Sequence, residues 1–242
     1  MTQDIIVFAI IGFIAQIIDG ALGMAYGVCS TTFLLSIGVP PAAASASVHT
    51  AEIFTSGVSG LSHLKLGNTD RELFKKLLIS GVMGGVLGAY ILTATPGGIM
   101  KPFVALYLLI MGVMILRKAF KKLQAGKAGI KLFPLGLAGG FFDAVGGGGW
   151  GPIVTSTLVA RGHNPRFTIG SVSLAEFFVT VAEVATFLST IRLVYWQVIV
   201  GLIIGGVSAA PLAAYICKRL PPRTLMIIVG MLIMALSMRT IL

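Results

Sequence analysis

Long apolar stretches, separated by short polar or basic breaks, run along the whole chain. They are about 15–22 residues long, close to the length at which a helix crosses a hydrocarbon core about 30 Å thick. This pattern predicts a helical protein that passes through a membrane many times. The predicted segments are 5–18, 24–37, 42–64, 77–93, 101–117, 132–145, 151–160, 166–188, 195–217 and 223–240.

The composition supports this class. The 242 residues are 56% hydrophobic and only 11% charged, and the mean hydropathy is +0.98, far outside the usual balance of a soluble domain. Cys29 and Cys217 stand within apolar stretches far apart in the sequence. No disulfide or metal-binding spacing is visible, so neither a metal nor another cofactor is expected. The N-terminus lacks the basic region of a secretory signal, and we expect the first segment to be retained.

The net charge of +10 has its own explanation in a membrane protein. In a soluble chain it would suggest a nucleic-acid partner, but no basic patch with interleaved aromatic residues occurs. When the segments are threaded through a bilayer, all Lys and Arg residues except Lys101, Arg192 and Arg239 fall on one side. That side is cytoplasmic by the positive-inside rule. The sequence thus predicts a multi-pass protein of the cell membrane with both termini extracytoplasmic.

An internal repeat runs through the chain. The stretch "DGALGMAYGVCSTTFLLSIGVPP" (19–41) aligns without a gap with "DAVGGGGWGPIVTSTLVARGHNP" (143–165), 124 residues further on. The same offset aligns "SVHTAEIF" (47–54) with "SVSLAEFF" (171–178). Apolar composition easily aligns Leu with Leu, but it does not align Asp, Glu, Pro and several Gly residues at one offset. We therefore interpret the chain as two copies of one unit.

The two copies have opposite orientations, because an odd number of crossings separates them. We predict an all-α polytopic membrane protein with two inverted-topology repeats. Each repeat is a broken or re-entrant pair of short helices followed by three transmembrane helices. The first repeat covers residues 1–120, a basic cytoplasmic linker covers 121–131, and the second repeat covers 132–242. This architecture is typical of secondary transporters, which bind substrate near the midplane where the repeats meet.

The glycine-rich breaks mark the candidate binding site. Irregular backbone survives inside a membrane only within protein or along a wet cavity. Helices that begin near Val28 and Pro152 would direct free amides and a positive dipole end towards such a cavity, which suits an oxyanion. Close helix packing is the other role of such glycines, and we favour it for Gly12, Gly84, Gly85 and Gly205. The predicted substrate-binding residues are Gly23, Tyr26, Gly27, Gly147, Gly148, Trp150, Gly151, Ser47 and Ser171.

Acidic residues occur within the membrane segments, where a charge facing lipid would be expensive. Asp19 and Asp143 stand at the two breaks, and we predict that they cap free backbone amides. Glu52 and Glu176 are repeat counterparts, and we predict that they handle protons. His49, three residues before Glu52, is the one obvious cationic partner. A further acid, Glu183, has no counterpart in the first repeat and could be simply a satisfied interior acid.

Each repeat opens with the motif D-x3-G-x2-aromatic-G and continues with a short helix, a G-x2-P turn and a helix that carries a mid-membrane Glu. This arrangement resembles the TauE/SafE sulfite exporter family, from about residue 5 to residue 240. The most specific part is "GGGGWGP" followed by "GHNPRFTIGSVSLAEF". The resemblance implies an integral membrane transporter of sulfur-containing anions, such as sulfite and organosulfonates. It supports the transport of anions in general more strongly than the transport of sulfite in particular.

We expect a secondary-active transporter in the lipid bilayer that exports a small sulfur-containing anion. Protons are a possible coupling ion, and a homodimer is a possible assembly. One alternative is a cation transporter or ion-coupled antiporter that uses the buried carboxylates. A remote alternative is an intramembrane serine protease, since "GVSG" (57–60) matches the pattern around such a nucleophile. That role needs a histidine on a neighbouring helix, whereas His49 shares the helix of Ser59. An enzyme is therefore not expected.

Overall fold

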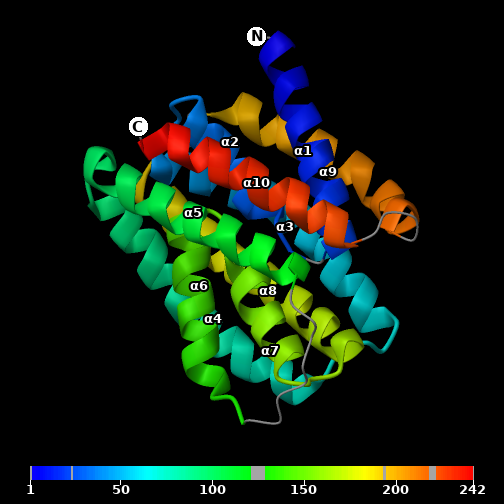
Figure 1. Ribbon diagram of the computed structural model, residues 1–242. Coiled ribbons are helices and arrows are strands. Elements are labelled where there is room, and N and C mark those ends of the chain that lie inside the picture. The colour runs from blue at the N-terminus through cyan, green and yellow to red at the C-terminus, as the bar shows by residue number, and fades with distance from the viewer. Residues whose placement is uncertain (1, 23, 121–128, 193–194, 218–221, 242) are drawn as a thin grey trace.

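The structure is a computed structural model that describes residues 2–22, 24–120, 129–192, 195–217 and 222–241. These residues form ten α-helices and one π-helical turn, and they contain no strand (Figure 1). The first-half helices are α1 (Thr2–Leu22), α2 (Tyr26–Ser36), α3 (Pro41–Lys65), α4 (Arg71–Ala94) and α5 (Gly97–Phe120). The second half contains α6 (Leu132–Gly146), the π-helical turn η1 (Gly151–Thr155), α7 (Ser156–Ala160), α8 (Pro165–Thr190), α9 (Trp196–Cys217) and α10 (Pro222–Ile241).

Each apolar segment predicted from the sequence coincides with a helix, with η1 and α7 together forming the segment predicted at 151–160. The all-helical prediction is therefore confirmed. In the described part of the chain, α4, α5 and residues 166–190 of α8 are long and apolar enough to cross a bilayer. Helix α3 is more polar, and its middle turns are buried among the other helices. Residues 121–128 of the predicted linker lie outside the described residues.

Four helix pairs make the most extensive contacts: α1 with α9, α4 with α6, α5 with α10, and α3 with α8. Figure 1 shows α10 lying along α5, and α1 beside α9 at the end of the bundle where the chain begins. Every one of these pairs joins a helix of the first half to a helix of the second. The halves are therefore interleaved and do not form two separate bundles.

Small residues allow this close packing. A Cβ atom on Gly205 would overlap the carbonyl oxygen of Ala9, and one on Gly84 would overlap the carbonyl oxygen of Leu137. Gly12 likewise lies against the backbone of Leu202. The packing role predicted for Gly12, Gly84 and Gly205 is confirmed, because only a residue without a Cβ lets two helix backbones approach so closely. Gly85, predicted to pack in the same way, lies against the side chain of Glu183.

The two predicted helix breaks have distinct backbone geometries. Between α1 and α2, Ala25 adopts φ 117°, a conformation that residues with a Cβ rarely take. After α6, Gly147 and Gly148 have φ 64° and 146°, which glycine adopts without steric conflict. The following helices begin at Tyr26 and Gly151, slightly before the predicted positions. The π-helical form of η1 was not predicted, although such turns often accompany functional sites.

Candidate functional site

The two helix breaks meet each other inside the protein. A Cβ atom on Gly27 would lie 2.6 Å from Cα of Gly148 and 2.7 Å from the carbonyl oxygen of Gly147. The hydroxyl of Thr31 in α2 donates a hydrogen bond of 2.7 Å to that same carbonyl oxygen. The two segments that align in the repeat are therefore in direct backbone contact, although 124 residues separate them in the sequence.

A cavity of about 480 Å³ lies beside this contact. Its wall combines both breaks with one face of α3 and one face of α8. The predicted site residues that line it are Asp19, Tyr26, Gly27, Glu52, Asp143, Gly148, Gly151 and Glu176. The cavity also has polar lining that was not predicted, notably Gln16, Thr55, Ser56, Ser59 and His63, and Ser173 lines it as well.

Other predicted site residues lie away from the cavity wall. The Ser171 hydroxyl accepts a hydrogen bond of 2.7 Å from the amide of Asp70, so it holds the turn between α3 and α4. Trp150 is fully buried, and its indole Nε1 donates to the carbonyl oxygen of Val172 over 3.1 Å. Ser47 is buried without lining the cavity. Gly147 stands behind the wall as the acceptor for Thr31, and Gly23 lies outside the described residues.

Each aspartate holds the backbone of its own break. Asp143 Oδ1 accepts hydrogen bonds from the amides of Gly149 at 2.5 Å and Trp150 at 2.8 Å. Asp19 Oδ1 accepts one from the amide of Tyr26 at 3.3 Å. These carboxyl groups satisfy amides that have no acceptor within the helices they begin. The same amides are therefore occupied in this conformation.

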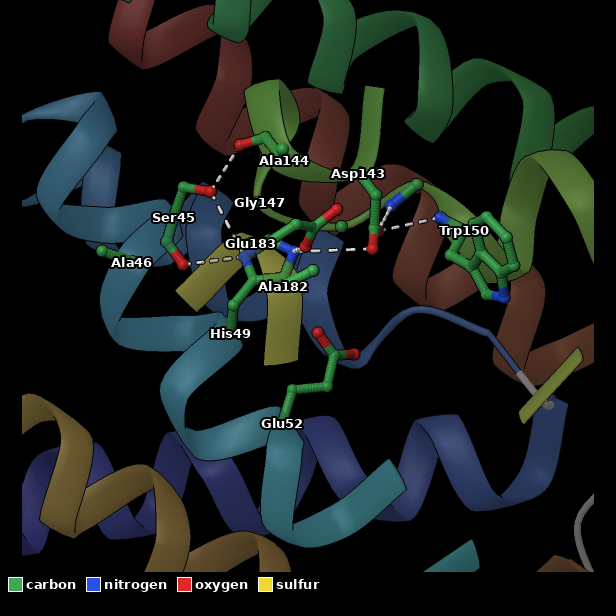
Figure 2. A network of polar contacts seen from close by, with 12 residues as sticks. Ser45, Ala46, His49, Glu52, Asp143, Ala144, Gly147, Trp150, Ala182 and Glu183 are labelled. Atoms are coloured by element: carbon green, nitrogen blue, oxygen red, sulfur yellow. Dashed lines mark hydrogen bonds and ion pairs between the residues drawn. The ribbon is translucent and has the colours of Figure 1, made fainter. Parts of the chain in front are cut away.

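His49 lies at the centre of a buried polar network, shown in Figure 2. Its Nδ1 is 2.8 Å from the carbonyl oxygen of Ser45, so Nδ1–H donates to that oxygen. Its Nε2 lies 2.9 Å from Glu183 Oε2 and 3.5 Å from Asp143 Oδ2. The Ser45 hydroxyl donates to the carbonyl oxygen of Ala144 over 2.5 Å. The network thus joins α3, α6 and α8 around one imidazole ring.

Glu183 is the member of this network that the sequence reasoning missed. The repeat directed attention to Glu52 and Glu176, which have counterparts, and Glu183 has none. A signal was available, however, because Glu176 and Glu183 are seven residues apart and therefore share one face of a helix. The predicted partner of His49 was Glu52. The structure places two other carboxyl groups, those of Glu183 and Asp143, at its free nitrogen.

A basic side chain also reaches the edge of the site. Lys118, in the last turn of α5, donates to the hydroxyl of Ser156 and, over 3.4 Å, to the carbonyl oxygen of Pro152. It also lies 3.7 Å from the sulfur of Met24. Met24 and Pro152 both line the cavity. Lys118 therefore ties the cavity edges from both halves together, a role that its position next to other basic residues did not indicate.

Comparison with known proteins identifies the family to which the chain belongs. Residues 8–240 match the family described as sulfite exporter TauE/SafE. The chain belongs to the TauE/SafE family. It is also 42% identical over 249 aligned positions to the "Probable membrane transporter protein YtnM" of Bacillus subtilis (strain 168), an alignment that covers 99% of this chain and 83% of that protein. No solved structure matches the chain.

Membership in the TauE/SafE family confirms the resemblance drawn from the glycine-rich motifs and identifies a membrane transport protein. It also excludes the remote alternative of a serine protease, because the family consists of transporters and not of enzymes. In this TauE/SafE protein Ser59 is a cavity-lining hydroxyl on the polar face of α3. Membrane localisation follows from the same membership and from the apolar helices.

Proposed function

We propose that this protein is a secondary-active transporter that exports small sulfur-containing oxyanions, such as sulfite or sulfonates, and binds one anion in the cavity between the two helix breaks. The observation that carries the proposal is the meeting of Gly27 and Gly148 at the wall of that cavity. Broken helices that face each other at a cavity are the usual substrate site of transporters built from inverted repeats. The volume of about 480 Å³ lies within the range of small-molecule sites, about 300–1,000 Å³.

The helix packing supports two inverted repeats with the predicted boundaries 1–120 and 132–242. A shift of 124 residues carries α1 onto α6 and α4 onto α9. Since α1 packs mainly on α9 and α6 mainly on α4, the shift exchanges these two pairs. The same shift carries α3 onto α8 and α5 onto α10, and the helices of each pair contact each other. An internal two-fold axis would produce this exchange of partners.

The polar lining suits an oxyanion whose charge is shared with protons. Gly27 and Val28 of the first turn of α2 line the cavity, as do the hydroxyl-bearing residues Ser59 and Ser173. Oε2 of the buried Glu52 has no hydrogen-bond partner among the described residues. A protonated Glu52 would donate a hydrogen bond to an oxyanion, whereas an ionised one would repel it. We infer that the anion binds together with protonated glutamates, which makes transport depend on protons.

The cavity lining extends from the buried interior towards one end of the bundle. Along α3 the lining residues pass from buried Glu52 to half-buried Ser59 and His63, near the C-terminal end of the helix. Along α8 the lining runs back from Glu176 towards Ile169, near the N-terminal end. The positive-inside rule assigns both of these ends to the cytoplasm. We infer that the cavity opens to the cytoplasm, where an exporter loads its substrate, and that both termini are extracytoplasmic.

A flux experiment tests this function. The purified protein is reconstituted in proteoliposomes, and fluxes of sulfite, a sulfonate, sulfate and simple cations are compared with and without a proton gradient. We expect flux of sulfite or the sulfonate that responds to the gradient. Protein-free liposomes serve as the control for leakage of the protonated, neutral form of sulfite. Uptake of a cation without any oxyanion flux would contradict the proposal.

A second candidate function is cation transport or ion-coupled antiport. The observation that favours it is the lining itself, because the carboxyl groups of Asp19, Glu52, Asp143 and Glu176 all reach the cavity. Among the lining residues, His63 is the one that can carry a positive charge. Ionised carboxylates would bind a cation there, so the cation arm of the same flux experiment decides between the two functions.

A further inference from the structure

The His49 network lies directly behind the cavity wall. His49 and Glu183 are fully buried and do not line the cavity, whereas Asp143 both lines the cavity and contacts His49. Since Nδ1–H donates to the Ser45 carbonyl oxygen, Nε2 is the ring atom that is free to gain or lose a proton. That atom lies 2.9 Å from Glu183 Oε2 and 3.5 Å from Asp143 Oδ2, carboxylate oxygens from two other helices.

We propose that Nε2 of His49 holds a proton that it shares with Glu183 and Asp143, and that this buried triad is the site of the transporter's coupling proton. This inference rests on the proposed function and names the residues through which protons act. It assigns the central role to a histidine and a glutamate outside the cavity. Glu52 and Glu176, the glutamates of the repeat, line the cavity and then act on the bound substrate.

The shorter of the two distances favours a proton over a metal ion, whereas the 3.5 Å between His49 Nε2 and Asp143 Oδ2 fits either. The separation of 2.9 Å between His49 Nε2 and Glu183 Oε2 is that of a close ion pair, short enough for the two atoms to share a proton. Three ligands around a tetrahedral metal ion would instead stand about 3.4 Å apart, given metal–ligand bonds of about 2.0–2.2 Å. The same three side chains are nevertheless of types that bind transition metals, so metal binding is included as an outcome of the test.

The surrounding charges require bound protons. The ionisable groups that interact electrostatically with members of the triad are Glu52 from α3 itself, Glu176 from α8 and Tyr107 from α5. These neighbours are acidic groups, and no Lys or Arg in the described part of the chain forms an ion pair with the buried carboxylates. A set of ionised carboxylates in a poorly solvated interior is prohibitive. An imidazolium at His49 offsets part of that charge.

Asp143 connects the proton to the substrate site. Its Oδ2 faces His49, and its Oδ1 accepts the amides of Gly149 and Trp150. If the proton leaves Nε2 for Asp143 Oδ2, the imidazole becomes neutral and so does the carboxyl group. Hydrogen bonds to a neutral acceptor are about half as strong as those to an ionised one. The two amides then become available to an oxyanion, so proton position and anion binding are linked.

The first test needs no substrate. The protein has three histidines, so nitrogen NMR of full-length protein labelled at histidine, in lipid nanodiscs, resolves them with His49→Gln as the assignment variant. We expect both ring nitrogens of His49 to be protonated at neutral pH, and Glu183→Gln to convert the ring to the neutral tautomer protonated at Nδ1. A neutral His49 in the unmodified protein would overturn the proposal. So would a His49 signal that shifts on stoichiometric binding of Zn²⁺, since that would identify a metal site.

The second test separates proton coupling from anion movement. In proteoliposomes, sulfite accumulation driven by a pH gradient is compared with sulfite exchange at equal pH. We expect Glu183→Gln to lower the ratio of accumulation to exchange by about tenfold or more, within the roughly 5–150-fold range of coupling between sites. Glu72→Gln is the matched control, because Glu72 is an exposed acid paired with Lys76 at the surface. The ratio for that variant should equal that of the unmodified protein.

The outcomes distinguish the two proposals. An unchanged ratio in a correctly folded Glu183→Gln protein overturns the coupling site, and so does an equal loss of accumulation and exchange. Folding is verified by elution profile and thermal unfolding. If the unmodified protein moves no sulfite or sulfonate, the proposed function fails, and the NMR experiment still decides whether His49, Glu183 and Asp143 hold a proton.

Discussion

The contact between the two helix breaks leads to a sharp prediction for Gly27→Ala. The added methyl group would meet Cα of Gly148 at 2.6 Å and the carbonyl oxygen of Gly147 at 2.7 Å. Ordinary van der Waals contact begins at 3.4 Å, so the two backbones must separate by roughly 0.8 Å in a packed interior. Backbone atoms line both sides of this contact, and no flexible side chain can move aside to make room.

The expected cost follows from this overlap. Inserting one methyl group into a packed core destabilises proteins by about 1–3 kcal/mol, and we expect Gly27→Ala to fall in that range. The separation also displaces the first turn of α2 from the cavity wall. Displacements of about 1 Å in a preorganised site cost up to roughly 100-fold in enzymes. We therefore expect substrate flux to fall by about tenfold or more.

Two measurements check this prediction, with Gly98→Ala as the matched control. Gly98 lies in the first turn of α5, where a Cβ atom would meet nothing within 4 Å. The temperature at which the detergent-solubilised protein unfolds reports stability, and proteoliposome flux reports the site. We expect Gly27→Ala to unfold at a lower temperature than Gly98→Ala and to transport less. Equal unfolding temperatures and equal flux in the two variants would refute the reasoning that the breaks touch.

Further predictions concern the hydrogen bonds and the opening of the cavity. Asp143→Asn should destabilise the protein by about 1.5–3 kcal/mol, because two amides lose an ionised acceptor; thermal unfolding measures this, and unchanged stability would contradict the assignment. Trp150→Phe should cost about 0.5–1.5 kcal/mol by removing the hydrogen bond that the indole donates to the carbonyl oxygen of Val172, which the same assay detects. In a cysteine-free background, Ser59→Cys and Ser173→Cys should react with an impermeant maleimide added from the cytoplasmic side; labelling exclusively from the outer side would reverse the proposed opening.

Hydropathy alone located the helices of this protein. Lipid cannot hydrogen-bond a backbone, so membrane segments must be long, apolar and helical, and that requirement is written locally in each stretch from 5–18 to 223–240. The internal repeat likewise identified both breaks and a group of the residues that line the cavity, among them Asp19, Glu52 and Glu176. Asp19 and Asp143 could be assigned to backbone capping because their hydrogen-bond partners lie only a few residues further along the chain.

The relative rotation and depth of the helices were decided by the tertiary structure alone. Ser171 and Ser173 are two residues apart, yet one holds the turn at Asp70 and the other lines the cavity. No pattern in the sequence separates these roles, because the face that a helix turns inward depends on its neighbours. The contact between His49 and Glu183 also requires α3 to pack on α8. These helices are far apart in the sequence, and local helix propensity does not determine how they pack. Buried ionisable groups are separated from water, so each of them needs a polar partner inside the protein. In this fold His49 and Glu183 provide that partner for each other.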